Sequence, residues 1–329
     1  MINLIINEWQ KVFSRKSNII IMVFIVGIAA LMSFMPLIFQ NEQANETSTY
    51  SENWESDVSQ EIDTLQEETE DLLNQDDTEL TFNDSMTVSL NQTEIERLSY
   101  HLEAGIEPPA SNNFYSSLVS ASSMNALIGI FVTIIASAMV SKEFSMGTIK
   151  LLLIRTQSRT KILTSKYITT LLLAFFYYGL LYLSTAIFAL FTTDMNPTSE
   201  YVFMTMNGTY EHVQFLSYFA GLVASNLVYL VIIASLAFML STLTRNTSLS
   251  LGATLGAIFL GTGVTQYLAS QTDLAKYLIT ANWSLENYLP GRTTYIDGVS
   301  LPFSAIVNVV YVAVFLGLSY YAFNKQDVL

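Results

Sequence analysis

The side chains that enzymes use for nucleophilic, acid–base and metal chemistry are scarce in this sequence. Its 329 residues include no cysteine and only two histidines, His101 and His212, which lie far apart along the chain. No His-Glu-x-x-His helix, Gly-x-Ser-x-Gly turn or Gly-x-x-x-x-Gly-Lys-Ser/Thr phosphate loop occurs. We therefore predict that the chain is not an enzyme, that it has no catalytic, cofactor-binding or metal site, and that it cannot hydrolyse ATP through that loop.

Binding to a soluble partner is indicated instead by the basic stretch from Ser141 to Lys166. Near its start, Glu143, Gly147 and Lys150 follow one another at intervals of four and three residues, which places them on one face of a helix. An adjoining apolar stripe consists of Phe144, Thr148, Leu151 and Leu152. The pattern predicts a short amphipathic helix that sits in a groove of a partner while its charges pair at the rim. The alternative is a basic loop that only fixes membrane orientation.

Three asparagines lie inside strongly apolar runs, at Asn125, Asn226 and Asn308. Polar groups at such positions can line a substrate path between helices. The other interpretation is hydrogen bonding between helices, typically worth under ~1 kcal/mol for each bond. The sequence leaves both interpretations open.

Six apolar runs must position these residues, and each reaches the ~20 residues that span the hydrocarbon core of a bilayer. They cover 18–39, 116–140, 166–192, 214–240, 247–268 and 303–323. A composition of 51% hydrophobic and 13% charged residues is too apolar for a soluble chain of this length. We predict an all-α polytopic membrane protein. Its other segments are 1–17, 40–115, 141–165, 193–213, 241–246, 269–302 and 324–329.

The distribution of charge predicts how the chain is oriented. Six basic residues occupy the stretch after the second run (Lys142, Lys150, Arg155, Arg159, Lys161 and Lys166), and 193–213 contains none. Because cytoplasmic loops are enriched in Lys and Arg, this stretch and both termini are predicted to be cytoplasmic. The cytoplasmic side then carries a net charge of +8 and the outer side −22. The basic rim suits anionic membrane lipid, and no nucleic-acid partner is implied.

The first seventeen residues predict a helix that lies in the membrane surface. Its apolar stripe comprises Ile2, Ile5, Ile6, Trp9, Val12 and Phe13. Glu8, Lys11 and Arg15 are expected on the opposite, polar face. Trp9 and the flanking cations are typical of the interface between membrane and water.

Residues 40–115 form the largest polar segment and predict an extracellular, acidic helical hairpin. Val58, Ile62, Leu65 and Leu72 would form one side of a narrow seam, and Ile95, Leu98 and Leu102 the other. We expect the second helix to begin at Thr93, where Thr-x-x-Glu resembles a capping box. Residues 269–302, which contain Pro290, Gly291 and Pro302, predict a re-entrant turn with interfacial aromatic residues.

Several of these segments resemble permease subunits of the ABC-2 type, the membrane halves of type V ABC transporters. The basic stretch resembles the first cytoplasmic loop of that family, with Glu143, then Gly147-Thr148, a leucine cluster, and Ser158-Arg159 before the next span. Asn7-Glu8-Trp9 with Lys11 and Arg15 resembles the interfacial helix of the family. The ending from Tyr320 to Val328 is similar to its closing pattern. The resemblance covers nearly the whole chain.

The resemblance implies a permease subunit of a bacterial ABC exporter in the cell membrane. It implies two copies of a separate ATPase, which binds ATP and Mg, and a second permease protomer, identical or homologous. Glu143, Phe144, Gly147, Thr148, Leu151, Leu152 and Arg159 would then transmit the movement of the ATPase. The expected cargo is a peptide or amphiphile, such as an antimicrobial peptide expelled for resistance. The alternative is a non-transporting membrane sensor or assembly scaffold whose hairpin binds an extracellular ligand.

Overall fold

The structure is a computed structural model of the full chain. It describes residues 1–43, 50, 53–74, 82–109, 113–148, 158–193, 200–205, 208–294, 296 and 298–325, with side chains omitted from 36 to 43. Leu151 and Leu152, expected to contact the ATPase, therefore lie outside the described residues.

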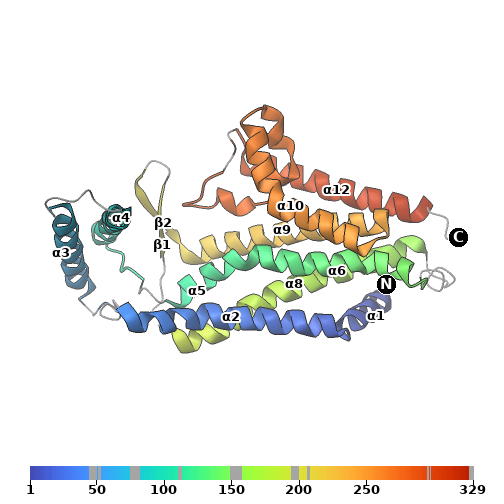
Figure 1. The fold of residues 1–329 in the computed structure, drawn as a ribbon, viewed down its shortest axis with the longest axis horizontal. Helices are drawn as coiled ribbons and strands as arrows, with labels where there is room; N and C mark the ends of the chain where they lie inside the picture. The colour runs from blue at the N-terminus through green and yellow to red at the C-terminus, as the bar shows by residue number, and fades with distance from the viewer. Residues whose placement is uncertain are drawn as a thin grey trace.

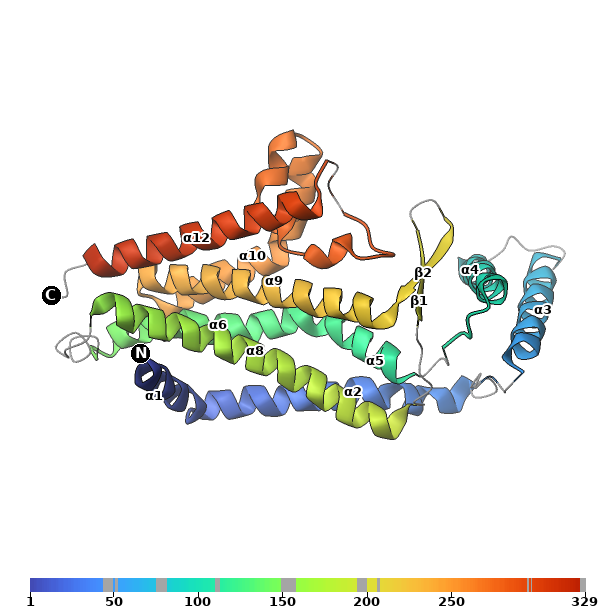
Figure 2. The same ribbon diagram turned by 180° about the vertical axis from the view of Figure 1, so that it is seen from behind.

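Helices long and apolar enough to cross a membrane form the body of the molecule, which confirms the prediction of an all-helical fold with six such segments. They are α2 (Lys16–Gln43), α5 and α6 together (Phe114–Ala121 and Asn125–Ser145), α8 (Arg159–Thr192), α9 (Phe215–Thr244), α10 (Thr247–Ala269) and α12 (Leu301–Lys325). A short 3₁₀ helix, Ser122–Met124, joins α5 to α6. These helices run side by side in one elongated bundle (Figures 1 and 2).

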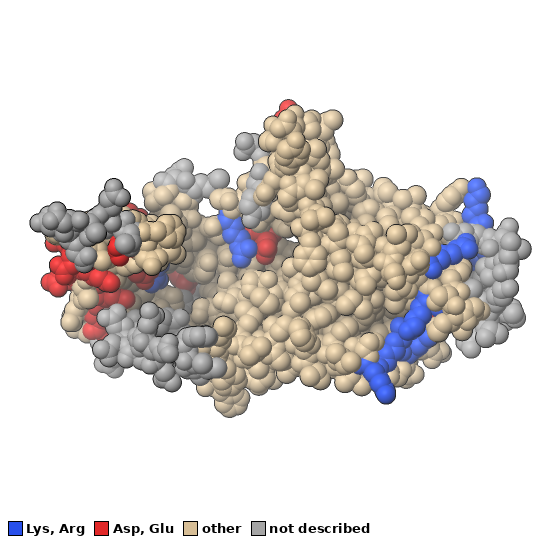
Figure 3. Space-filling model, viewed as in Figure 1, with Lys and Arg blue, Asp and Glu red and all other residues tan. Residues whose placement is uncertain are grey.

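The two ends of the bundle differ in charge. Lys and Arg side chains gather at the end where α1 (Ile2–Phe13) lies and α12 ends, and Asp and Glu gather at the other (Figure 3). We call them the basic end and the acidic end. The long surface between them shows few charges in this view. An apolar belt between two charged ends is what a bilayer requires of a protein that spans it.

The core is centred on α9, which packs against α6, α8, α10 and α12. Tyr177 of α8 and Phe238 of α9 are fully buried in it. By contrast, α10 and α12 expose large apolar side chains such as Phe259 and Val309. Water does not normally contact surfaces of this kind over so many residues, so lipid or a second protein is expected to cover them.

Two helix boundaries differ from those expected, and the differences matter at the basic end. The second span continues to Ser145 instead of ending at 140, and α8 begins at Arg159 instead of 166. Ser158 caps α8, because its Oγ accepts a hydrogen bond from the Lys161 N–H at 3.4 Å. As a result Glu143 and Lys166 are both helical residues. The predicted bounds were those of the membrane spans, and both helices continue beyond them into the polar residues at this end.

Two helices at the acidic end, α3 (Trp54–Leu73) and α4 (Phe82–Ala104), pack against each other. Val58 and Leu98 are fully buried between elements, as the seam predicted. The expected start at Thr93 is wrong. The Thr93 hydroxyl donates to the Ser89 carbonyl at 2.9 Å, inside a helix that begins eleven residues earlier. Phe82, Met86 and Leu90 do follow a four-residue spacing before Thr93, but all three are exposed, and the polar residues between them led sequence reasoning to miss that part of α4.

The segment 193–213 contains a two-stranded antiparallel ribbon that the sequence analysis did not predict. Strand β1 (Glu200–Met204) pairs with β2 (Tyr210–Gln214), with Val202 opposite His212. The ribbon projects beyond α9 toward α4 (Figures 1 and 2). Tyr210 donates to the Thr93 carbonyl at 3.0 Å, and Tyr100 of α4 hydrogen-bonds to His212 Nδ1 at 2.8 Å. The ribbon therefore connects the bundle to α4.

The segment between α10 and α12 folds into short turns that lie against the bundle. They are a 3₁₀ helix at Asp273–Tyr277, α11 (Ile279–Asn282) and a second 3₁₀ helix at Leu285–Tyr288. Gly261 of α10 permits this contact, because a Cβ there would lie 2.5 Å from Thr280 Cγ2. The segment closes one side of a cavity described below.

Candidate functional site

At the basic end, two lysines and two glutamates from three helices form a buried charge cluster. Its members are Glu8 and Lys11 of α1, Glu143 of α6 and Lys166 of α8. The side chains of Lys166 and Glu143 are only 1% and 3% exposed. Charged groups are almost never buried to this degree unless they are paired.

The pairing within this cluster is reciprocal and electrically neutral. Lys166 Nζ lies 2.9 Å from Glu8 Oε2 and 3.2 Å from Glu143 Oε1. Lys11 forms a second ion pair with the same Glu143 oxygen, and the Thr148 hydroxyl donates to the other one. Glu143 is thus held by groups from α1, from α8 and from the turn that follows α6.

Polar side chains of α1 reach into this cluster. Glu8 and Lys11, which were predicted on the polar face of the helix, both contact it. Trp9 also packs inward, with its ring centroid 5.9 Å from that of Phe176 in α8. Ile2 and Ile6 remain exposed. Arg15 lies in the turn between α1 and α2, where its N–H donates to the Val12 carbonyl at 3.1 Å.

The expected amphipathic helix at 143–153 does not begin as predicted. Helix α6 ends at Ser145, and Gly147 adopts a positive φ of 68° that ends the helical path. Glu143 and Gly147 therefore do not share a helix face. Instead the turn folds Thr148 back onto Glu143. Residues 149–153, the rest of the predicted helix, lie outside the described part of the chain.

Neighbouring residues at this end tie the helices together. Phe144 lies under the Arg245 guanidinium, 4.7 Å from ring centroid to carbon, and contacts Phe323 edge to face. Arg159 donates to the Asn324 carbonyl at 3.2 Å. Of the residues expected to contact the ATPase, the structure thus brings Glu143 and Thr148 together and places Phe144 and Arg159 against the end of α12.

Each carboxylate and each ammonium of the cluster has a charged partner within it. Removing one member of a buried pair leaves an uncompensated charge and typically costs about 3–5 kcal/mol. A shift of the turn at 146–148 that pulled on Glu143 would therefore be opposed by both lysines, and α1, α6 and α8 would respond together.

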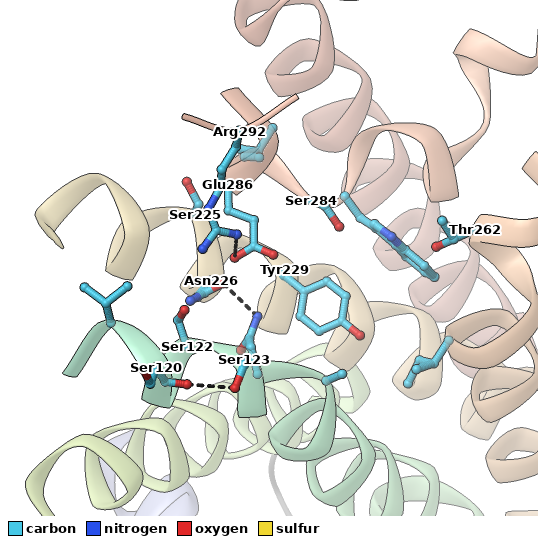
Figure 4. Close-up of a pocket in the computed structure, with 16 residues that line it drawn as sticks. Ser120, Ser122, Ser123, Ser225, Asn226, Tyr229, Thr262, Ser284, Glu286 and Arg292 are labelled. Atoms are coloured by element: carbon cyan, nitrogen blue, oxygen red, sulfur yellow. Dashed lines mark hydrogen bonds and ion pairs between the residues drawn. The ribbon is translucent and has the colours of Figure 1, made fainter. Parts of the chain in front are cut away.

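A cavity of about 540 Å³ lies nearer the acidic end, among α6, α9, α10 and the turns before α12. Five serines and one threonine line it: Ser120, Ser122, Ser123, Ser225, Thr262 and Ser284. Asn125, Asn226, Tyr229, Glu286 and Arg292 complete its polar lining (Figure 4). We call it the asparagine cavity. Its volume lies within the range of small-molecule sites, about 300–1,000 Å³.

The two asparagines of this cavity were among the predicted path-lining residues. Asn125 Nδ2 donates to Asn226 Oδ1 at 3.0 Å, which joins α6 to α9. Each stands eleven residues after the start of its span, about 16 Å along the helix. Asn308 lies elsewhere: its Nδ2 donates to the Asn282 carbonyl at 2.8 Å and holds α11 against α12. Two of the three asparagines therefore line one cavity, and the third fastens its wall.

An ion pair completes the polar side of the asparagine cavity. Arg292 Nη1 lies 3.3 Å from Glu286 Oε2, and both side chains are roughly one-third exposed. Burial raises the pKa of the Glu286 carboxyl above its ordinary value of 4.5, and the positive charge of Arg292 lowers it in part. Trp283 packs edge to face on Tyr229, with 5.7 Å between ring centroids, and forms the aromatic wall.

Sequence reasoning missed Lys166, Glu286 and Arg292 as site residues. One signal was available for Lys166: Glu8 and Glu143 are the only two acidic residues predicted near the cytoplasmic side before Asp327. Isolated acids in a basic region suggest specific partners. No comparable signal marks Glu286. Among the described residues, no group of three His, Asp or Glu side chains is arranged to hold a metal ion.

Comparison with known proteins places the chain among related sequences. A family model described as "Protein of unknown function (DUF2705)" matches residues 81–329. "Uncharacterized protein YhcI" of Bacillus subtilis (strain 168) is 30% identical over 331 residues, which is 100% of this chain and 99% of that protein. "Uncharacterized membrane protein YdbK" of the same organism is 25% identical over 224 residues, covering 68% of this chain and 87% of that protein.

Proposed function

The chain belongs to the DUF2705 family of proteins of unknown function, and we propose that it is the permease subunit of an ATP-driven exporter in the bacterial cell membrane. The single observation that carries the proposal is the attachment of the turn at 146–148 to three helices through Glu143. A soluble ATPase that moved this turn would act directly on the spans. Because the same stretch resembles ABC-2-type permeases, we expect that ATPase to be the ATP-binding subunit of an ABC transporter.

The proposed orientation places the basic end and both termini in the cytoplasm. The positive-inside rule supports it, and the figures show the basic and acidic side chains at opposite ends (Figure 3). In this orientation α1 lies at the inner membrane surface with Ile2 and Ile6 turned toward lipid. The α3–α4 hairpin and the ribbon then stand outside the cell.

The proposed assembly contains two ATPase subunits and a second permease protomer, identical or homologous. The exposed apolar surfaces of α10 and α12 suit either that protomer or lipid. ATP and Mg would bind to the ATPase and no cofactor to this chain. The proposed cargo is a peptide or amphiphile, with antimicrobial peptides as the leading candidates. Closure of the ATPases would push the turn at 146–148 and rearrange α1, α6 and α8.

A sensor or assembly scaffold is the second candidate function. Its support is that the described residues of α4 and the ribbon meet through hydrogen bonds on an exposed surface, such as Tyr100–His212. A hairpin attached in this way can move when an external ligand binds. The two candidates differ in one respect, since only the exporter requires an ATPase.

The test is whether the chain co-purifies with an ABC-type ATPase from the same bacterium, followed by measurement of ATP hydrolysis and export. Glu143→Gln removes the charge that Lys11 and Lys166 share, and Glu143→Lys reverses it. Both variants should insert into the membrane yet lose export, with ATP hydrolysis no longer stimulated by cargo. Lys142→Glu is the matched control, because it changes the charge of an exposed neighbour. Full export by both Glu143 variants would refute the coupling role.

A further inference from the structure

The lining of the asparagine cavity is rich in hydrogen-bond acceptors. The Ser123 hydroxyl gives its hydrogen to the Ser120 carbonyl at 2.7 Å, and that of Ser225 to the Gly221 carbonyl at 2.8 Å. A hydroxyl that donates within its own helix keeps oxygen lone pairs for another partner. Both serine oxygens are therefore available to accept from a ligand.

The asparagine pair adds a buried acceptor that has no partner. Asn125 is 9% exposed, and its Oδ1 makes no hydrogen bond. Asn226 Nδ2 is also unbonded, but it is a donor. The acceptor of the pair that lacks a partner is therefore Asn125 Oδ1, in a side chain that lines the cavity. A buried polar atom without a partner typically costs about 1–3 kcal/mol, so a ligand that bonds to it restores that energy.

Glu286 gives the same lining a negative charge. Its carboxylate pairs with Arg292, and burial nonetheless raises its pKa above 4.5, so it is incompletely stabilised by that one partner. A second positive group would stabilise the ionised form. Figure 4 shows Asn226 between the Glu286–Arg292 pair and Ser123, so the charge and the neutral acceptors line one continuous space.

We propose that the asparagine cavity binds an organic cation rich in N–H groups, the ammonium or guanidinium side chain of a peptide. Several acceptors and one carboxylate match a group that offers three to five donors and a positive charge. The Tyr229 and Trp283 rings supply an apolar wall for the aliphatic stem of such a side chain. A bare metal ion fits poorly, because Na⁺-sized cations need several oxygens in contact and this cavity measures about 540 Å³.

The identification of this cavity as a cargo site rests on the proposed function. Binding of the cation by itself requires neither the ATPase nor transport. Binding is therefore measured on the purified full chain alone, in lipid nanodiscs, by saturation-transfer NMR. The probes are N-acetyl-lysine N-methylamide and N-acetyl-norleucine N-methylamide, which differ in the ammonium group. The lysine probe should bind at least about tenfold more tightly, the fold-change expected for one hydrogen bond to a charged group.

Variants identify the residues responsible. Glu286→Gln should remove the preference for the lysine probe, and Asn125→Leu should weaken that probe several-fold while leaving the norleucine probe unchanged. Glu211→Gln is the control for diffuse attraction, because Glu211 is an exposed carboxylate of β2. Binding of the lysine probe should also decline as pH falls through the raised pKa of Glu286. A single cooperative thermal transition would show that the variants are folded, even where Asn125→Leu lowers its midpoint by removing the bond to Asn226.

Three results would overturn the inference. The first is equal binding of the two probes. The second is an equal loss in Glu211→Gln and Glu286→Gln, which would indicate unspecific charge attraction. The third is displacement of the lysine probe by Na⁺ at concentrations where N-methylglucamine has no effect, which would indicate a metal-ion site. Specific binding without ATPase association would instead uphold the cation site and count against the exporter.

Discussion

Replacing Lys166 with methionine should destabilise the chain more than any other single charge removal at the basic end. The ammonium lies 2.9 Å from one glutamate oxygen and 3.2 Å from another, in a side chain 1% exposed. At an effective dielectric of about 20, charges at such distances attract by about 5 kcal/mol for each pair. Part of this is offset because methionine avoids the cost of burying a charge, and Glu143 keeps Lys11. The expected net loss is about 3–5 kcal/mol.

The assay is thermal unfolding in detergent, followed by intrinsic fluorescence. A loss of this size should lower the Tm by at least about 6 °C, taking 2–4 °C for each kcal/mol. Lys161→Met is the matched control: it makes the same change on the same helix at an exposed position, and it should stay within about 0.5 kcal/mol of the parent. The double variant Glu8→Gln with Lys166→Met should recover part of the loss, because it leaves no unpaired carboxylate at position 8.

The reasoning fails if Lys166→Met unfolds at the same temperature as Lys161→Met. That result would mean that water or lipid headgroups solvate the two glutamates once the lysine is gone. An equally informative failure is a double variant less stable than Lys166→Met alone. The charges would then not act as pairs, and the cluster could not transmit movement from the turn at 146–148.

Three further predictions concern orientation, the turn and pH. In this cysteine-free chain, a single cysteine at Ser56 should be labelled by an impermeant reagent in intact cells. A single cysteine at Ser158 should be labelled only after permeabilisation, and the reverse pattern would invert the proposed orientation. Gly147→Val should cost about 1–2 kcal/mol locally, because φ is +68° there and a β-branched residue is strained at positive φ, and it should weaken ATPase association. Asn tolerates that conformation, so Gly147→Asn should retain ATPase association. Equal behaviour of the two variants would exclude the backbone explanation. Burial lowers the pKa of His101 below 6.5; the charge of Arg97 lowers it further, and the hydrogen bond to the Ile106 carbonyl opposes the shift. The unfolded chain therefore takes up a proton first as the pH falls, and protease resistance of α3 and α4 should decline below about pH 6.5. His101→Gln should abolish that pH dependence, whereas His212→Gln should not.

The sequence by itself determined the helical segments, because the signal for each is local. Around twenty consecutive apolar residues are recognisable wherever they occur, and the six runs correspond to the six described helices that are long and apolar enough to cross a membrane. The predicted burial of Val58 and Leu98 followed in the same way from the spacing of apolar residues. Helix starts set by polar residues were harder: Ser158 begins α8 ahead of its apolar run, and α4 begins at Phe82 in a polar region.

Only the tertiary structure decided which polar residues meet. Lys166 and Glu8 are 158 positions apart, and Asn125 and Asn226 are 101 apart, so no spacing along the chain relates them. Glu286 reaches the asparagine cavity because short turns fold back against α10 at Gly261. A buried charge or amide must find its partner wherever packing brings one within about 3 Å, since water is not there to replace it. That requirement selects the pairs after the helices have packed, and a linear pattern does not contain it.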